Sequence, residues 1–301
     1  MRIATFQYQG RRHVGIVSDD LQSVAPFQWT EARTRRGAQA LIEDDVNGHE
    51  SLALTSAPVP MDQIRLEAPL PLPRRNIFCV GRNYHAHAKE LAASVFKDNT
   101  PKADSWPIVF TKVPESVIGP HDEVRLPGPH VSTQIDYEAE LAVVIGRRAK
   151  HVSADRAYDY VLGYTAFNDV TARDFQFADG QWQRGKSCDT FAPMGQTIVT
   201  TDTITDPHKL SIKLVLNGQT MQDSNTDQLI FGVPELIEFL SQSITLEPGD
   251  VIATGTPPGV GFARNPPVFL KPGDKMEVLI EGMGGLGNPV VSESQLKQEN
   301  E

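Results

Sequence analysis

One segment constrains the fold more than any other: the run DYEAELAVVIG at residues 136–146. Its aliphatic and β-branched residues favour a strand, whose side chains alternate between two faces. Glu138 and Glu140 are therefore expected on one face. Two adjacent carboxylates in a partly buried place are costly unless one is protonated or a cation lies between them. The pattern predicts a site for a hard divalent metal, and the alternative is an edge strand with two solvated acids.

Charge and cysteine content narrow the class of protein. The formal net charge of -10 argues against nucleic acid or an anionic membrane as partner, because both require a basic surface. The two cysteines, Cys79 and Cys188, have no metal-binding or disulfide spacing, which fits a reducing compartment. Residues 1–10 lack the apolar core of a signal peptide, and no apolar run approaches the ~20 residues of a membrane span. A cytoplasmic protein is the expectation.

The chain divides into a small and a large part. The segment EAPLPLP at residues 67–73 has proline at every second position, which removes backbone donors and keeps the chain extended. We interpret 69–73 as a linker between a small accessory domain (residues 1–68, with a helix at about 34–43) and a catalytic domain (74–291). The polar tail at 292–301 is expected to be disordered.

A histidine and an acid lie one helical turn apart after the first predicted strand of the large domain. Residues 85–97 favour a helix, and His87 and Glu90 would be neighbours on one face of it. A carboxylate orients an imidazole and raises its basicity, as a general base requires. His85 is the competing candidate, but it has no acid one turn onward. The polar segment that follows, residues 98–107, is either a lid together with this helix or a surface loop.

Further polar residues cluster after the strand at 161–167. A short helix is predicted at 170–177, and Asp169, Arg173 and Gln176 would share its face. Lys186 follows a glycine in a loop-like setting and can approach a ligand closely. The spacing GxxxxGKS at 180–187 matches a phosphate-binding loop, but it neither follows an apolar strand nor opens a helix, so nucleotide binding is not expected. Cys188 has no partner histidine that would make it a nucleophile.

Five stretches taken together resemble the fumarylacetoacetate hydrolase family. They occur in the family's order and cover about residues 75–291: VGRNY at 80–84 with His87 and Glu90, DYEAE at 136–140, NDVTARD at 168–174, GKSCDTF at 185–191 and TGTPPGVG at 254–261. The resemblance implies a mostly β (α+β) protein, with a mixed β-sandwich roll as catalytic domain behind a small N-terminal α+β domain. A homodimer is implied as well.

The resemblance also implies roles for individual residues. Carried over by motif, three carboxylates would hold Mg²⁺ or Mn²⁺, and an acid and a histidine would activate water. The implied metal ligands are Glu138, Glu140 and Asp169; the implied catalytic residues are His87, Glu90, Lys186 and Gln176; the implied substrate-binding residues are Arg82, Tyr84, Arg173 and Thr256. Three acids without a paired histidine or thiolate suit such an oxygen-seeking ion. Cys188 and Ala192 depart from residues common in relatives, which concerns the shape of the pocket.

The implied ligand is a small anionic 2-oxo acid. We expect a metal-dependent hydrolase that cleaves the C–C bond of a 2,4-dioxo acid, an acylpyruvate such as fumarylpyruvate, through enolate chemistry at the metal and a water activated by His87 and Glu90. The alternative is an isomerase of 2-hydroxyhepta-2,4-diene-1,7-dioate, or a decarboxylase of 5-oxopent-3-ene-1,2,5-tricarboxylate or oxaloacetate. A non-catalytic metabolite-binding protein is a third possibility, which the intact His87–Glu90 pair disfavours.

Overall fold

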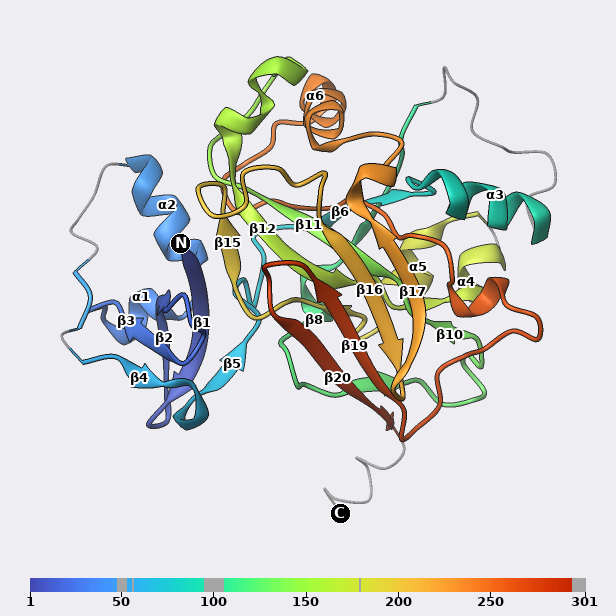
Figure 1. Cartoon of the computed structure of the whole chain (residues 1–301), viewed down its shortest axis with the longest axis horizontal. Helices are drawn as coiled ribbons and strands as arrows, with labels where there is room; N and C mark the ends of the chain where they lie inside the picture. Colours follow the sequence, from blue (N-terminus) through green and yellow to red (C-terminus); the bar gives the residue numbers. More distant parts are fainter. Residues whose placement is uncertain (48–52, 56, 95–105, 179, 294–301) are drawn as a thin grey trace.

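The computed structural model describes residues 1–47, 53–55, 57–94, 106–178 and 180–293. Its dominant feature is a large β-sheet, on which a second, smaller sheet packs, with short helices around the edges (Figure 1). The expected mostly β fold of the family is confirmed.

The large sheet has eleven strands in the order β4-β3-β2-β1-β15-β12-β11-β18-β6-β7, and β5 pairs with β1 off this path. The strands are β1 (Arg2–Tyr8), β2 (Arg11–Val17), β3 (Ser23–Pro26), β4 (Val59–Pro60), β5 (Arg65–Glu67), β6 (Ile77–Gly81), β7 (Ile108–Lys112), β11 (Ala139–Ile145), β12 (Val161–Asn168), β15 (Ile198–Thr200) and β18 (Val251–Ala253).

The first strand joins the N-terminal part of the chain to this sheet. In β1, Arg2 lies opposite Val199 of β15, and Ile3 lies opposite Ile198, so the sheet continues from residues 1–67 into the rest of the chain. The domain boundaries at 68 and 73 remain predictions. The tail at 294–301 and most of the expected lid, residues 95–105, lie outside the described residues.

The acid-bearing segment forms the middle of the large sheet. Strand β11 pairs with β12 on one side and with β18 on the other, and all seven of its residues are buried. The edge-strand alternative is therefore wrong. The strand begins at Ala139 rather than at Asp136, because Asp136 belongs to β10 (Ile135–Asp136), which pairs with β13 (Thr171–Ala172). Tyr137 and Glu138 lie in the break between β10 and β11.

The second sheet closes the sandwich. Its order is β17-β16-β19-β20-β9, and one core contains aliphatic residues from both sheets, among them Leu141 and Val143 of β11 and Leu214 and Val278 of the second sheet. The strands are β9 (Val124–Leu126), β16 (Ser211–Leu216), β17 (Gln219–Asn225), β19 (Lys275–Ile280) and β20 (Gly285–Ser292), and a small parallel pair is formed by β8 (Val117–Ile118) and β14 (Ala192–Pro193).

The helices are short and differ in detail from the prediction. The expected helix at 34–43 is two helices, α1 (Glu31–Thr34) and α2 (Gln39–Asn47), separated at Gly37, whose φ of 59° interrupts a right-handed helix. The helix expected at 170–177 begins only at Arg173, since the two residues before it form β13. The remaining elements are α3 (His85–Ser94), α4 (Arg173–Ala178), α5 (Trp182–Lys186), α6 (Val233–Ser243) and the 3₁₀ turns η1 (Met61–Gln63), η2 (Pro114–Ser116), η3 (Ala154–Tyr160), η4 (Thr226–Gln228) and η5 (Gly261–Ala263).

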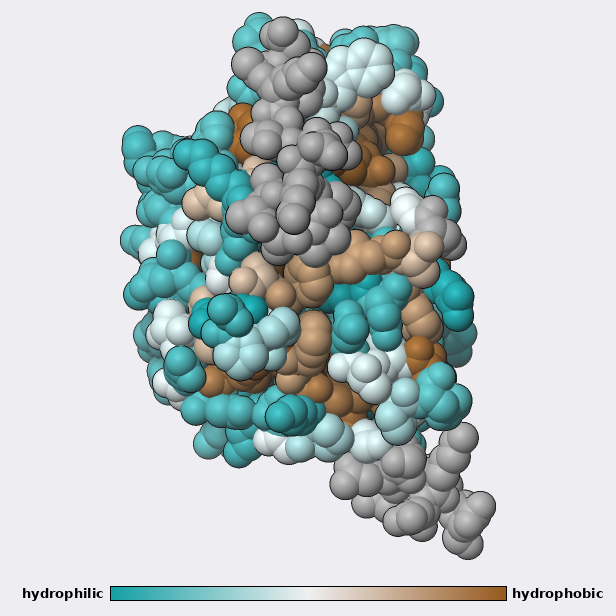
Figure 2. All heavy atoms as spheres, turned by 90° about the vertical axis from the view of Figure 1, so that its right-hand side faces the viewer, coloured by the Kyte–Doolittle hydropathy of each residue, from teal (hydrophilic) through white to brown (hydrophobic). Residues whose placement is uncertain are grey.

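The side of the molecule that carries α3 and α4 has hydrophobic residues gathered near its middle and hydrophilic residues around them (Figure 2). In the described part of the chain, no helix combines the length and apolar character needed to cross a bilayer. Helix α5 contains Gly185 and Lys186 at its end, so the GxxxxGKS spacing does not open a helix as a phosphate-binding loop does.

Candidate active site

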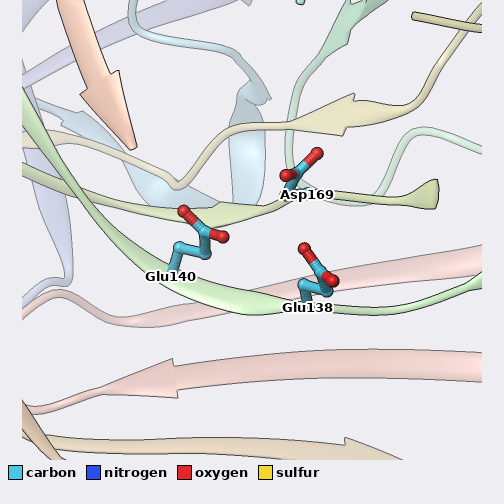
Figure 3. Close-up of side chains that lie close together, drawn as sticks. All are labelled: Glu138, Glu140 and Asp169. Carbon is cyan, nitrogen blue, oxygen red and sulfur yellow. The ribbon is translucent and has the colours of Figure 1, made fainter. Parts of the chain in front are cut away.

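Three buried acids meet where β11 and β12 lie side by side. Glu138 directly precedes β11, Glu140 is the second residue of β11, and Asp169 follows the end of β12; their carboxylates point into one shared space (Figure 3). One oxygen from each lies within 4.8 Å of the others, and none of the three residues is more than 5 % exposed. The structure thus brings together the three predicted metal ligands.

Backbone pairing fixes this meeting point. The backbone N–H of Asp169 donates to the carbonyl of Glu138 at 2.9 Å, and the N–H of Glu138 donates to the Asn168 side-chain oxygen at 3.0 Å. Asn168 lies opposite Ala139 in the ladder, so the end of the β11–β12 pair carries both acids. Glu138 and Asp169, 31 positions apart in sequence, are held as neighbours by the sheet.

Two buried lysines neutralise part of this charge. The Nζ atom of Lys186 lies 2.7 Å from Glu138 Oε2 and 2.6 Å from Asp169 Oδ2. Lys112, the last residue of β7, reaches the other oxygen of Asp169 at 2.6 Å and the carbonyl of Val170 at 3.0 Å. Lys112 was not among the predicted site residues.

Arg173 connects the cluster to a fourth acid. Its NH2 lies 2.7 Å from Glu138 Oε1 and 2.8 Å from Asp136 Oδ2, and its NH1 donates to the Gln176 side-chain oxygen at 2.9 Å. Asp136 also accepts from the backbone N–H groups of Gly261 and Phe262, so its position is fixed. Arg173 and Gln176 therefore lie side by side as predicted, and Asp136 holds the Arg173 guanidinium in place.

Glu140 stands apart from the other acids. Among the described residues no lysine or arginine nitrogen lies within 4.0 Å of its carboxylate, which accepts a hydrogen bond from the backbone N–H of Gly255 at 2.8 Å. It is 1 % exposed. A buried carboxylate with only a neutral donor is costly to ionise. This side of the cluster is therefore the one that lacks a positive charge.

The pKa values follow this asymmetry. Burial and the charges of Asp169 and Glu138 raise the pKa of Glu140 well above its usual range. Burial also acts to raise the pKa of Glu138, but Lys186 and Arg173 outweigh it and hold that pKa below its usual range. For Lys186, burial is outweighed by Asp169 and Glu138, which raise its pKa and keep the ammonium charged.

Helix α3 presents the predicted histidine and acid to the site. His87 Nδ1 lies 3.0 Å from Glu90 Oε2, and His87 is 3 % exposed. Glu90 in turn accepts from the backbone N–H of Gly259 at 3.1 Å. His85, the competing candidate, is exposed at the start of the helix. The structure therefore separates the two histidines, and only His87 faces inward.

A small cavity joins these groups: a water-sized sphere can occupy about 20 Å³ of it, and its empty volume, open solvent included, is about 300 Å³. Thr256 lines it, and its hydroxyl accepts from Gln222 at 2.8 Å. Arg82 lines it too, whereas the buried Tyr84 is not among the lining residues. The residues around the cavity are Val80, Gly81, Arg82, His87, Phe110, Glu138, Glu140, Arg173, Gln176, Trp182, Lys186 and Thr256.

The donor set fits a hard divalent cation. Oxygen ligands from three carboxylates, without a histidine nitrogen or thiolate among them, are what Mg²⁺ and Mn²⁺ prefer. Counting Asp136, the site holds four buried carboxylates against three buried cations, Lys112, Arg173 and Lys186. A divalent cation beside Glu140 would leave the site positive, which suits an anionic ligand.

Four positions were missed by the sequence analysis, and they share one cause. Lys112, Asp136, Trp182 and Gln222 each act through a residue distant in sequence, as in the contact of Lys112 with Asp169, 57 positions away. Each looks locally like an ordinary strand or helix residue. Only Lys112 gave a weak signal in the sequence. It is a charged residue at the end of a short apolar strand, and a charge buried there requires a partner of opposite charge.

The fold and the site together define a β-sandwich enzyme with a buried carboxylate cluster and a histidine–glutamate pair at one cavity. Residues 76–291 match the family described as fumarylacetoacetate (FAA) hydrolase C-terminal. The chain belongs to the fumarylacetoacetate hydrolase family, as the resemblance had implied.

Named relatives carry more than one activity. The chain is 45% identical to a mitochondrial oxaloacetate tautomerase of Rattus norvegicus, over 97% of this chain and 92% of that protein. It is 39% identical to an oxaloacetate tautomerase of Bacillus subtilis (strain 168), over 96% of this chain and 100% of that protein. A solved fumarylacetoacetate hydrolase from the psychrophile Exiguobacterium antarcticum is 36% identical, with a TM-score of 0.82, over 97% of this chain and 100% of that one.

Proposed function

We propose that this protein interconverts the keto and enol forms of a 2-oxo dicarboxylic acid of the oxaloacetate type, with Mg²⁺ or Mn²⁺ as cofactor. The observation that carries the proposal is the buried His87, oriented by Glu90, on the same cavity as Glu138 and Glu140. The curated relatives support it because they are named oxaloacetate tautomerases. Of the activities expected from the sequence, the isomerase branch is thus better supported than the hydrolase.

The cofactor would have one role. A divalent cation held by Glu138, Glu140 and Asp169 would polarise the 2-oxo group and stabilise negative charge on its oxygen. Lys186 donates to Glu138 and Asp169, which leaves the third N–H of its ammonium for a ligand oxygen at the same place. These groups favour the enolate over the neutral ketone.

His87 would move the proton. Its Nδ1 faces Glu90, so Nε2 is the nitrogen left for the ligand, and Glu90 stabilises the imidazolium that forms when C3 is deprotonated. A second proton transfer to the 2-oxygen gives the enol, and the reverse sequence restores the ketone. No atom is gained or lost, so the reaction needs no water and no second substrate.

The remaining polar groups would hold the ligand. The side-chain oxygen of Gln176 accepts from Arg173, which leaves its NH₂ group as the end able to donate. The Thr256 hydroxyl is oriented in the same way. Its oxygen accepts a hydrogen bond from Gln222, which leaves its hydrogen to donate to the ligand. Arg82, at the cavity with a φ of 55°, supplies a guanidinium for the distal carboxylate.

The second candidate is C–C bond hydrolysis of an acylpyruvate, which the likeness to the solved fumarylacetoacetate hydrolase favours. It needs room for an attacking water and for the acyl group in addition to the pyruvoyl unit. We further propose that the protein forms a homodimer. Size-exclusion chromatography with light scattering tests this, and the expected mass is twice 33.1 kDa.

One experiment separates the candidates. The Mn²⁺-loaded protein is mixed with the enol of oxaloacetate, and its ultraviolet absorbance is followed; acetylpyruvate and fumarylpyruvate are incubated in parallel and the products identified by mass spectrometry. Metal-dependent acceleration of the enol decay without new products supports the tautomerase. Release of pyruvate from the acylpyruvates, with no acceleration of the enol decay, overturns it in favour of the hydrolase.

A further inference from the structure

Two aromatic rings form a wall of the cavity. Phe110 of β7 and Trp182 of α5 both line it, and their ring centroids lie 5.3 Å apart at an angle of 61°. The Nζ atom of Lys186 lies 4.9 Å from the centroid of the Phe110 ring. Since Lys186 also contacts two of the acids, a continuous series of contacts leads from the carboxylate cluster through Phe110 to Trp182.

The indole of Trp182 packs closely against Gly81. A Cβ atom at Gly81 would lie 2.5 Å from Cζ3 and 3.0 Å from Cη2 of Trp182, closer than any side chain could be tolerated without movement of the ring. The φ of Gly81 is not in the left-handed region, so the backbone itself does not demand glycine here. The close approach of the indole is what requires a glycine at this position. Gly81 and Trp182 therefore fit each other.

The position of this contact matters for a ligand. Arg82 directly follows Gly81 and lines the same cavity as Trp182. A dicarboxylate that placed its 2-oxo acid end at Glu138 and Glu140 would direct its other end toward Arg82. Each additional methylene would push that end against the indole.

We propose that Trp182, held between Phe110 and Gly81, sets the length of the 2-oxo acid that binds beside the acids, so that four-carbon dicarboxylates are preferred to longer ones. This inference rests on the proposed function for the class of ligand. It adds the residue that selects within that class. A pocket of fixed length discriminates one methylene by about 10-fold to 200-fold, so the effect is measurable.

The test compares ligand binding in three proteins. The dissociation constants of oxaloacetate, 2-oxoglutarate and 2-oxoadipate are measured by calorimetry on Mn²⁺-loaded wild type, Trp182→Ala and Gly81→Ala. Trp182→Ala is expected to lower the ratio of the 2-oxoadipate constant to the oxaloacetate constant by about tenfold or more. Gly81→Ala, whose new methyl group displaces the indole, is expected to change this ratio as well, because it moves the residue that sets the length.

The control is the affinity for Mn²⁺ alone, which neither substitution should change by more than about twofold because neither residue contacts an acid of the cluster. An unchanged ratio in a folded Trp182→Ala protein overturns the inference. If Trp182→Ala does not fold, Trp182→Phe takes its place, and an unchanged ratio there has the same meaning. The proposed function fails separately: wild type that binds oxaloacetate but does not accelerate its tautomerisation contradicts that function, whereas the ratio still decides the role of Trp182.

Discussion

The Nζ atom of Lys112 lies 2.6 Å from Oδ1 of Asp169, and neither side chain has any exposed surface. Lys186 lies at 2.6 Å from the other oxygen, Oδ2. Asp169 is therefore held between two ammonium groups, one at the end of β7 and one at the end of α5. Lys112 is not among the residues that line the cavity, so it supports the acid from outside the site.

Replacement of Lys112 by Met should destabilise the protein strongly. The substitution removes one partner of a buried ion pair and leaves Asp169 less compensated, which costs about 3–5 kcal/mol in the free energy of unfolding. Urea unfolding of the metal-free protein measures it. The matched control is Arg148→Met, which removes the exposed ion pair with Glu247 and should have little effect. Similar stability of the two variants would contradict the structural role of Lys112.

His87→Ala should lower turnover by about 10²–10⁴-fold, since it removes the proposed proton carrier. His85→Ala is the matched control: the same residue type lies two positions earlier on the same helix but is exposed. The rate of enol decay with saturating Mn²⁺ measures both. Equal rates for the two variants would show that the inward histidine has no part in the reaction.

Addition of metal should raise the stability of the fold. A ligand that binds only the folded state stabilises it by about 2.7 kcal/mol at a concentration 100 times its dissociation constant. Thermal unfolding with Mn²⁺ and with a chelator measures the shift. Glu138→Gln should abolish most of it, because one of three charged ligands is lost. A full shift in that variant would exclude Glu138 as a ligand.

The pH dependence of the metal-free protein should show the raised pKa of Glu140. Between its ordinary pKa in the unfolded chain and the higher pKa in the fold, the unfolded chain releases the proton first. Rising pH therefore destabilises the fold over this window. Glu140→Gln removes the ionisation, and its amide oxygen can still accept from Gly255.

We therefore expect Glu140→Gln, in the presence of a chelator, to melt at a higher temperature than wild type at pH 8. The difference should shrink as the pH falls toward 4, where the carboxyl of the wild type is protonated in both states. With Mn²⁺ present the order should reverse. A variant that is less stable than metal-free wild type at pH 8 would contradict the assignment of Glu140 as the uncompensated acid.

Local spacing was enough to predict part of the site. The period of two placed Glu138 and Glu140 together, and one helical turn placed Glu90 beside His87 and Gln176 beside Arg173. These relationships hold because each joins residues no more than three positions apart. Asp169 was added by the family resemblance, since only the β11–β12 pairing brings it beside Glu138.

The rest depends on tertiary pairing, which spacing does not contain. Asp136 was noted only as the start of the acidic strand, yet it pairs with β13 and orients Arg173. Lys186 was expected in a loop-like setting and is the last residue of α5, where it contacts Glu138 and Asp169. Strand β11 was expected to have one polar face, but a core packs on each face: Leu141 and Val143 belong to one core cluster, Ala142 and Val144 to another. In each case the neighbouring strand or helix decides the role of the residue.

The most direct test of the proposed function is the rate at which oxaloacetate enol converts to the ketone, measured with Mn²⁺-loaded wild type, chelator-treated wild type and His87→Ala. Acceleration by the loaded wild type alone, with no carbon dioxide or pyruvate released, is the predicted result. If the enol decays no faster with the Mn²⁺-loaded wild type than in buffer alone, the proposed function is contradicted.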